Sequence, residues 1–207
     1  MENNKFTKII SAVLTVILIV TLLCGITAAA RPYENLRENL FRLHIIANSN
    51  SAEDQALKLS VRDAMLPKVK ELFDELDIET FAGDCYAQKT ANAARSICGR
   101  LSAIAQQAVY ACGSTMTAAV MVGYETFPQK TYDTLTVPAG EYHCLRIVLG
   151  AGKGENWWCV LYPPLCISPA VAEQYFTKEE MDILSRPEQY RFRFAIWEWL
   201  KKRYHVG

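Results

Sequence analysis

Cysteine and histidine are the residue types in this chain with the most chemistry available to them. The sequence of 207 residues contains seven cysteines and three histidines. A cysteine beside a histidine can be activated as a nucleophile, as in exported enzymes that cut the cell wall. His143 and Cys144 are adjacent, but neighbouring side chains of a strand point to opposite faces, so they cannot form a local pair. Cys159 could meet His44 only through a long-range contact. An exported cell-wall hydrolase that uses such a Cys/His pair is one of two hypotheses for the function of this chain, and the alternative one.

The other patterns that could support chemistry are weak. The histidines lie in unrelated contexts, with neither a His-Glu-x-x-His nor a Cys-x-x-Cys spacing, so we expect no metal site. Residues 150–154, Gly-Ala-Gly-Lys-Gly, lack the Ser or Thr that follows the lysine of a phosphate loop, and a strand is expected next. We interpret them as a tight turn and expect no cofactor and no small-molecule substrate. The 22 basic and 22 acidic residues cancel, which argues against a nucleic-acid binder.

An apolar segment near the N-terminus predicts export. Residues 9–30 contain no charged side chain, and about 22 residues of helix are enough for roughly 30 Å of hydrocarbon. Lys5 and Lys8 precede the segment, which predicts a cytoplasmic N-terminus. An Ala-x-Ala motif ending at Ala30 also fits a signal-peptidase site. The sequence therefore predicts a signal peptide or a membrane anchor at 1–30.

The elements that position the remaining residues follow an α+β pattern. After a stalk at 31–40, we expect one domain at 41–207 with helices packed on a mostly antiparallel sheet. We expect residues 142–149 and 157–162 to pair as a hairpin across the glycine turn. The other expected elements are a half-buried strand at 41–46, a helix capped by Ser51 and kinked or split near Pro67, a second helix at about 83–111, a strand at 114–127, a short strand at 135–137, and helices at 177–185 and 190–204. The helix after Ser51 carries one apolar stripe, and Thr177 with Glu180 predicts a capping box for the helix at 177–185. The last helix is basic and aromatic, and either rests on anionic lipid or packs with a solvated face.

Six of the seven cysteines lie outside the apolar segment, and six cysteines allow 15 complete pairings. Cys85, Cys98 and Cys112 are expected on one continuous helix, about 20 Å apart along its axis. At that spacing they cannot bond one another, and we expect them to be buried thiols.

Two long blocks of this sequence resemble a known family. One is Asn-Trp-Trp-Cys followed by Pro-Pro-Leu-Cys, after a Gly-x-Gly-x-Gly loop, and the other is FRLHIIANSNSAEDQALKLSVRDAML at 41–66. Both resemble the stage II sporulation protein R family, and with their spacing they cover most of the chain after residue 40. The resemblance implies a developmental signal rather than an enzyme.

The resemblance also implies where the signal acts and on what partner. Family members are made in the forespore and exported across its membrane into the intermembrane space. There they trigger a membrane-embedded aspartic protease of the mother cell, of the stage II sporulation protein GA type. That protease processes an inactive sigma-E precursor. We therefore expect a secreted or membrane-anchored protein with a protein partner and a membrane, and with no catalytic residues.

Within the blocks that carry the resemblance, a disulfide and a partner-binding surface are expected. Cys159 and Cys166 flank two prolines, and closing this loop of about eight residues contributes ~2.5 kcal/mol before strain. Trp157 and Trp158 point to opposite faces of a strand, so one should enter the core and the other should lie at the surface, where it can anchor a partner. The alternative is that both are covered, one of them by the C-terminal helix. The turn before the first long helix serves either capping or recognition, and it carries more donors and acceptors than one cap requires. Its candidate partner-binding residues are Asn48, Ser49, Asp54 and Gln55.

Overall fold

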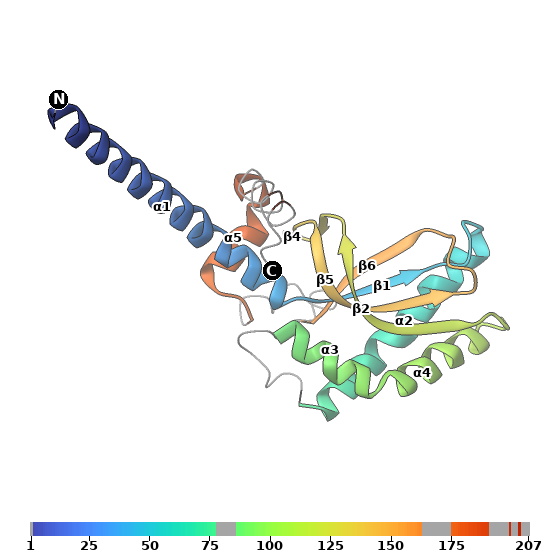
Figure 1. Ribbon diagram of the computed structural model, residues 1–207. Helices are drawn as coiled ribbons and strands as arrows, with labels where there is room; N and C mark the ends of the chain where they lie inside the picture. Colours follow the sequence, from blue (N-terminus) through green and yellow to red (C-terminus); the bar gives the residue numbers. More distant parts are fainter. Residues whose placement is uncertain (1, 78–85, 163–174, 191–198, 200–202, 204–207) are drawn as a thin grey trace. The chain divides into compact units, whose positions relative to one another are not determined.

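The computed structural model describes residues 2–77, 86–162, 175–190, 199 and 203 (Figure 1). Residues 35–187 form one compact unit, and a second unit contains the chain up to Glu34 and from Glu188 onwards. Helix α1 (Glu2–Glu38) begins in the second unit and ends in the first. In the described part of the chain, no helix combines the length and the hydropathy needed to cross a membrane. The signal peptide or anchor at 1–30 stays a prediction.

A four-stranded mixed sheet is the framework of the unit formed by residues 35–187. Its strand order is β2-β5-β1-β6, and the strands are β1 (Phe41–Ile46), β2 (Ala118–Phe127), β5 (Gly140–Leu149) and β6 (Asn156–Tyr162). Strand β1 pairs parallel with β5 and antiparallel with β6, and β2 pairs antiparallel with β5. The α+β class is confirmed, and two of the three pairings are antiparallel.

The predicted hairpin between 142–149 and 157–162 is wrong, because β1 lies between β5 and β6 (Figure 1). A central strand has its backbone groups satisfied along both edges, which suits β1 because it is buried almost throughout. The glycine turn consequently passes around the end of β1 instead of closing a hairpin. Gly154 N donates to Ala47 O at 2.8 Å, and Lys153 N donates to Asn48 O at 3.0 Å.

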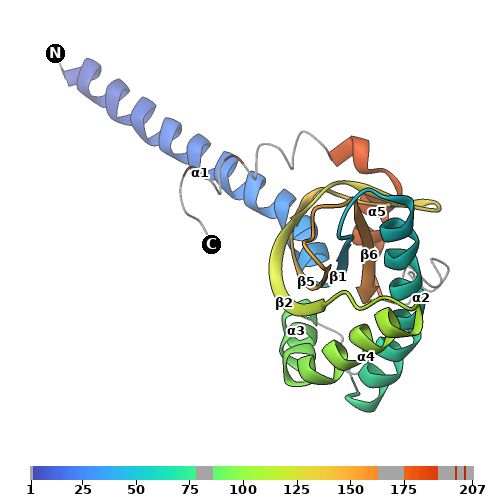
Figure 2. The ribbon, with the colours of Figure 1, turned by 90° about the vertical axis from the view of Figure 1, so that its right-hand side faces the viewer.

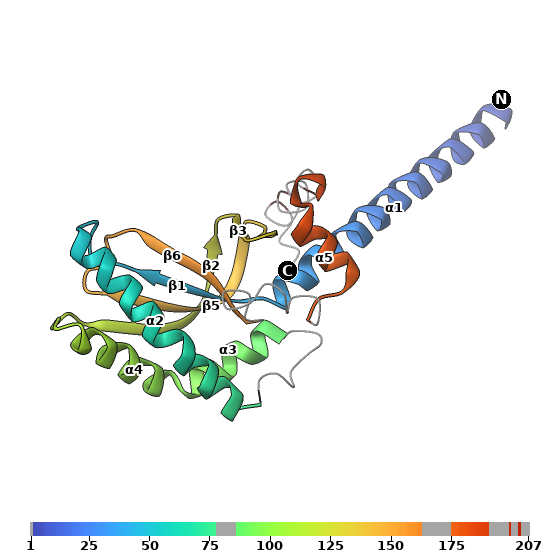
Figure 3. The same cartoon turned by 180° about the vertical axis from the view of Figure 1, so that it is seen from behind.

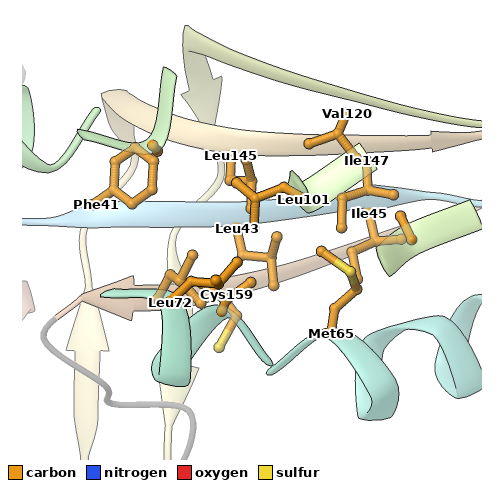
Figure 4. Close-up of a cluster of buried hydrophobic side chains, with 14 of the residues drawn as sticks. Phe41, Leu43, Ile45, Met65, Leu72, Leu101, Val120, Leu145, Ile147 and Cys159 are labelled. Atoms are coloured by element: carbon orange, nitrogen blue, oxygen red, sulfur yellow. The ribbon is translucent and has the colours of Figure 1, made fainter. Parts of the chain in front are cut away.

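Three helices cover one face of the sheet (Figures 1 and 2): α2 (Ala52–Glu75), α3 (Tyr86–Ser96) and α4 (Cys98–Ala111). Helix α2 begins at the predicted cap, where the Ser51 side chain accepts from Asp54 N. The predicted apolar stripe of α2 meets apolar residues of the sheet in the core (Figure 4). Core residues from both sides include Leu43, Ile45, Met65, Leu72, Leu101, Val120, Leu145 and Ile147.

Two helix predictions differ from the structure. Helix α2 continues past Pro67 to Glu75, so the proline does not split it. The helix predicted at about 83–111 is two helices that meet at Ile97, whose backbone angles are φ −110° and ψ 13°. Because of this break, α3 packs on β1, β2 and β5, while α4 packs on α2 and β2. One straight helix cannot follow both directions.

The opposite face of the sheet is partly covered by smaller elements. Strands β3 (Lys130–Tyr132) and β4 (Leu135–Val137) form a separate antiparallel pair, and Asp133 between them has a positive φ of 53°. Helix α5 (Lys178–Ser185) contacts β4, and Figure 3 shows both elements on the side away from α2, α3 and α4. The capping box predicted for α5 is present, with Thr177 and Glu180 exchanging hydrogen bonds. The helix expected at 190–204 lies largely outside the described residues.

The end of α1 belongs to the folded unit. Leu36 and Leu40 are buried, and Arg37 donates from Nη2 and Nε to Glu141 O at 2.7 and 3.0 Å. Residues 35–40, the second part of the predicted stalk, are thus anchored to β5.

Candidate functional site

The face of the sheet turned away from α2, α3 and α4 carries a row of polar and aromatic side chains. In β1, Leu43 and Ile45 point into the core, so Arg42 and His44 point to the other face. The strand register places one residue of each strand in a row across that face: Met121, Arg146, His44 and Trp158. These four residues, with Glu125 and Asn156, are called the distal cluster below.

His44 lies at the centre of the distal cluster and is only 6% exposed. Its Nδ1 is 2.8 Å from Glu125 Oε2, and its Nε2 is 2.9 Å from Asn156 Oδ1. The imidazole stacks on Trp158, with ring centroids 3.7 Å apart and planes inclined by 19°. Both ring nitrogens are occupied, so the geometry holds the ring in place and leaves it no free nitrogen with which to act as a base.

Glu125 connects His44 to Arg146, whose Nη1 donates to Glu125 Oε1 at 2.7 Å. The other donors of this guanidinium have only weak acceptors or none. Its Nη2 reaches the Met121 sulfur at 3.5 Å, and its Nε has no acceptor among the described residues. The Arg146 side chain is 36% exposed. The Nε is buried, but Nη1 and Nη2 carry two donors each, so the partly exposed guanidinium retains hydrogen-bonding capacity towards a group from outside.

A fully buried arginine, Arg42, lies at one end of this face. The Nη2 of Arg42 donates to Tyr132 Oη at 2.9 Å, and its Nε donates to Cys159 O at 3.4 Å. Its guanidinium carbon lies 4.2 Å from the centroid of the Phe127 ring and 5.0 Å from that of Tyr142. Burial raises the pKa of Tyr132, and the charge of Arg42 partly offsets the rise. Arg42 therefore attaches β3 to the sheet, and the prediction of a half-buried strand at 41–46 is wrong because both of its faces are covered.

The two tryptophans point to opposite faces, as the alternation predicted. Trp157 pairs with Ile45 and packs against the core, and the guanidinium carbon of Arg62 lies 5.2 Å from its ring centroid. Trp158 pairs with His44 on the distal face. Both side chains are half-buried. Trp158 is therefore the tryptophan that lies outside the core.

The polar turn at 48–55 is bonded internally. Asp54 Oδ2 accepts from Asn48 Nδ2 at 2.8 Å and from Ser49 Oγ at 2.5 Å. Gln55 Nε2 donates to Ser49 O at 2.8 Å, and Gln55 Oε1 accepts from Lys58 Nζ at 2.6 Å. The hydrogen bonds to Asp54 lower the pKa of its carboxyl, those from Ser49 and Asn48 most strongly. These bonds account for the density of polar groups that suggested recognition.

The same turn holds the glycine loop at 150–154. Asn48 Oδ1 accepts from Ala151 N at 2.9 Å, and Asn50 Oδ1 accepts from Glu155 N at 2.7 Å. A Cβ at Gly154 would collide with the backbone of Ser49, and one at Gly150 would collide with the Asn48 side chain. The predicted tight turn is confirmed, with positive φ at Gly150 and Gly152. The glycines are required by close packing against the polar turn.

The structure does not assemble the Cys/His pairs that motivated the hydrolase hypothesis. Cys159 pairs with Leu43 in the ladder and points into the core, whereas His44 points to the distal face. Burial, with a further contribution from Glu125, raises the pKa of the Cys144 thiol to about 12, the opposite of an activated nucleophile. Among the described residues, no group of three or more His, Cys, Asp or Glu side chains could hold a metal ion.

The predictions of buried thiols and of a disulfide can be tested only for the cysteines in the described part of the chain. Cys112 is exposed and Cys98 is half-buried, so the expectation of buried thiols is wrong for both. Cys85 lies outside the described residues. Cys166 does as well, and the predicted Cys159–Cys166 bridge stays a prediction.

Sequence reasoning missed Glu125, Arg146 and Asn156, and considered His44 only as a catalytic base. Glu125 is 81 residues from His44 along the chain, so no local pattern connects them. One signal was available: Arg42 and His44 alternate with the apolar residues Phe41, Leu43 and Ile45. Polar residues in such a strand need partners on its other face.

Comparisons with known proteins identify relatives for most of this unit. The model of the family described as Stage II sporulation protein R (spore_II_R) matches residues 37–172. The Stage II sporulation protein R of Bacillus subtilis (strain 168) is 37% identical over 130 residues, which are 62% of this chain and 54% of that protein. The chain thus spans about half the length of this curated relative. No solved structure matches the chain. The complete distal cluster lies within the matched range.

Proposed function

This chain belongs to the stage II sporulation protein R family, and we propose that it is an exported sporulation signal. In this proposal it crosses the forespore membrane and triggers a membrane-embedded aspartic protease of the mother cell, of the stage II sporulation protein GA type. The protease then processes the inactive sigma-E precursor. The family match over residues 37–172 is the observation that carries the proposal.

Export is supported by the apolar surface of α1. Its side chains between Ile9 and Val20 are exposed on every side of the helix, including Leu14 at 60% and Leu18 at 67%. Exposed apolar surface of this extent is unfavourable in water and favourable in hydrocarbon. We propose that this part of α1 is the signal peptide or anchor, and that the unit formed by residues 35–187 acts in the intermembrane space.

The distal cluster is the surface proposed to read the partner. Of the residues predicted for partner binding, Trp157 packs against the core, and the turn of Asn48 and Asp54 is bonded internally. Trp158 remains, fixed between His44 and Phe127. A rigid tryptophan in one row with a partly exposed guanidinium, with His44 between them, has the composition of a binding hot spot. The proposal needs no catalytic group in this chain.

Co-expression tests the proposed function. The full chain, the candidate protease and the sigma-E precursor are expressed in a host that contains none of them, and the processed fraction of the precursor is measured. We expect processing only when all three are present and the chain is exported. Processing at the same rate without this chain, or no processing with it, would contradict the proposal.

A further inference from the structure

Strand β2 lies at one edge of the four-stranded sheet, and part of its outer edge is protected. In an antiparallel ladder, alternate residues direct both their N–H and their C=O away from the neighbouring strand. Ala118 and Val120 belong to this outward set, because their backbone groups bond outside β5. Gln106 Oε1 accepts from Ala118 N at 2.9 Å, and Cys98 Sγ lies 3.4 Å from Val120 O, to which it donates.

The outer edge beyond Val120 is unprotected. The β2–β5 register is unbroken from Ala118 to Phe127, so the outward set continues with Val122, Tyr124 and Thr126, which we call the free edge. In the described part of the chain, no group bonds to the outward N–H and C=O of these three residues. Tyr124 is 55% exposed and Thr126 is exposed.

Most of the devices that normally prevent edge pairing are missing from this stretch. Edge strands are usually shortened, bulged, or interrupted by proline or charged residues. Strand β2 has ten residues, no register shift, and neither proline nor lysine; its one charged residue, Glu125, is bonded to His44 and Arg146. The first half of its edge is covered by side chains from α4, whereas the free edge is left available. That difference favours a functional reason for the exposure.

Cationic groups flank the free edge on both faces of the sheet. On the distal face, the side chain of Arg146 is 36% exposed. On the other face, His143 lies beside Tyr124, with ring centroids 4.9 Å apart, and its Nδ1 is buried without a partner. Arg95 is exposed on α3, the helix that packs on β2 and β5; burial and, to a smaller extent, the charge of Arg95 lower the pKa of His143. The Nη1 of Arg95 donates to a neutral side chain, that of Asn92.

We propose that the free edge binds an extended, acidic segment of the partner protease as an additional strand of the sheet. The backbone of the segment pairs with Val122, Tyr124 and Thr126, and its carboxylates meet Arg146 on one face and Arg95 on the other. A second copy of this chain fits less well, because it brings the same cations to the edge, while Glu125, the acidic residue of β2, is already bonded to His44 and Arg146. This inference rests on the proposed function and specifies how the partner is held.

Proline scanning separates edge pairing from folding. Thr126→Pro removes an outward N–H and blocks an incoming strand, while the ladder to β5 keeps its hydrogen bonds. Thr126→Ala is the matched control, and Val122→Pro with Val122→Ala repeats the comparison. In the co-expression assay with the full chain, each proline variant should reduce precursor processing at least fivefold relative to its alanine control. Thermal unfolding of each variant checks the fold.

Charge reversal provides a second test that needs no backbone change. Arg95→Glu should reduce processing at least fivefold. Lys89→Glu is the control, because Lys89 is exposed on the same helix, α3, but its side chain points about 120° away from that of Arg95. If the proline variants unfold, the comparison of Arg95→Glu with Lys89→Glu tests the inference by itself.

The outcomes that test this inference can be distinguished from those that test the proposed function. Loss of processing by folded Thr126→Pro and by Arg95→Glu, with active controls, supports the inference. Normal processing by Arg95→Glu and by folded proline variants would overturn the inference and leave the proposed function intact. Self-association of the full chain that is lost in Thr126→Pro, with processing retained, would instead assign the edge to a second copy. An inactive wild-type chain overturns both proposals.

Discussion

The imidazole of His44 and the indole of Trp158 stack at a centroid distance of 3.7 Å, which joins β1 to β6 on the distal face. Phe127 contacts the same indole edge-on, with centroids 4.7 Å apart and planes inclined by 63°. The tryptophan is therefore held between two rings before any partner arrives. A side chain fixed in advance loses less conformational entropy on binding.

Substitution of the two tryptophans should have different consequences. Trp157→Ala should lower the free energy of unfolding by about 2 kcal/mol, because a half-buried side chain leaves the core. Trp158→Ala should cost about 1 kcal/mol, the value of an aromatic stack, yet reduce partner affinity ~30-fold or more, the equivalent of about 2 kcal/mol.

Thermal unfolding and precursor processing, measured on both tryptophan variants, check this difference. If both variants lose activity only in proportion to lost stability, Trp158 is a structural residue and the partner binds elsewhere.

The packing of the glycine loop against the polar turn predicts an asymmetric response to alanine. Gly154→Ala should destabilise the protein by about 1–3 kcal/mol, because its Cβ meets the backbone of Ser49, which cannot move aside. Gly99→Ala is the control, since no atom lies within 4 Å of its added Cβ. A helical glycine replaced by alanine should stabilise by up to about 1 kcal/mol. Equal melting temperatures for the two variants would refute the close packing.

Thiol reactivity should differ strongly between two free cysteines. The Cys144 thiol, with a pKa raised to about 12, stays protonated and unreactive at pH 8.5, and only strongly alkaline solution ionises it. Cys112 is exposed and should react with iodoacetamide under native conditions. Mass spectrometry of the labelled protein, before and after unfolding, checks the order. Rapid native labelling of Cys144 would show that its site is open to solvent.

The bridge predicted for Cys159 can be assigned by peptide mapping. Two of the cysteines that could pair with Cys159, Cys85 and Cys166, lie outside the described part of the chain. We expect non-reduced digests to contain a Cys159–Cys166 peptide, and both thiols to resist labelling until reduction. A Cys85–Cys159 peptide would reassign the bridge, and free labelling of Cys159 without reductant would remove it.

Local patterns predicted the elements of this fold well. Ser51 and Thr177 cap their helices as expected, because a cap depends on residues three positions apart. The alternation of Trp157 and Trp158 also placed them on the correct faces. Each of these features depends on chain segments a few residues long.

Strand pairing and the distal cluster could not be predicted in the same way. The short glycine turn favoured a hairpin, whereas β1, about 100 residues earlier in the chain, pairs with both strands. Glu125 and Arg146 meet His44 only after that pairing is made. The residues that form the candidate site are therefore set by strand order, which no local sequence pattern reports.

The central claim is that the chain acts on a membrane protease from outside the cytoplasm. Precursor processing by Leu18→Arg tests it most directly, because a charge in the middle of the apolar segment costs ~2.5–3.5 kcal/mol for membrane insertion. Leu59→Arg is the control, since Leu59 is 39% exposed on α2, outside that segment. We predict that Leu18→Arg remains in the cytoplasm and abolishes processing, while Leu59→Arg processes normally. Normal processing by a Leu18→Arg chain that fractionation finds wholly in the cytoplasm would contradict the account.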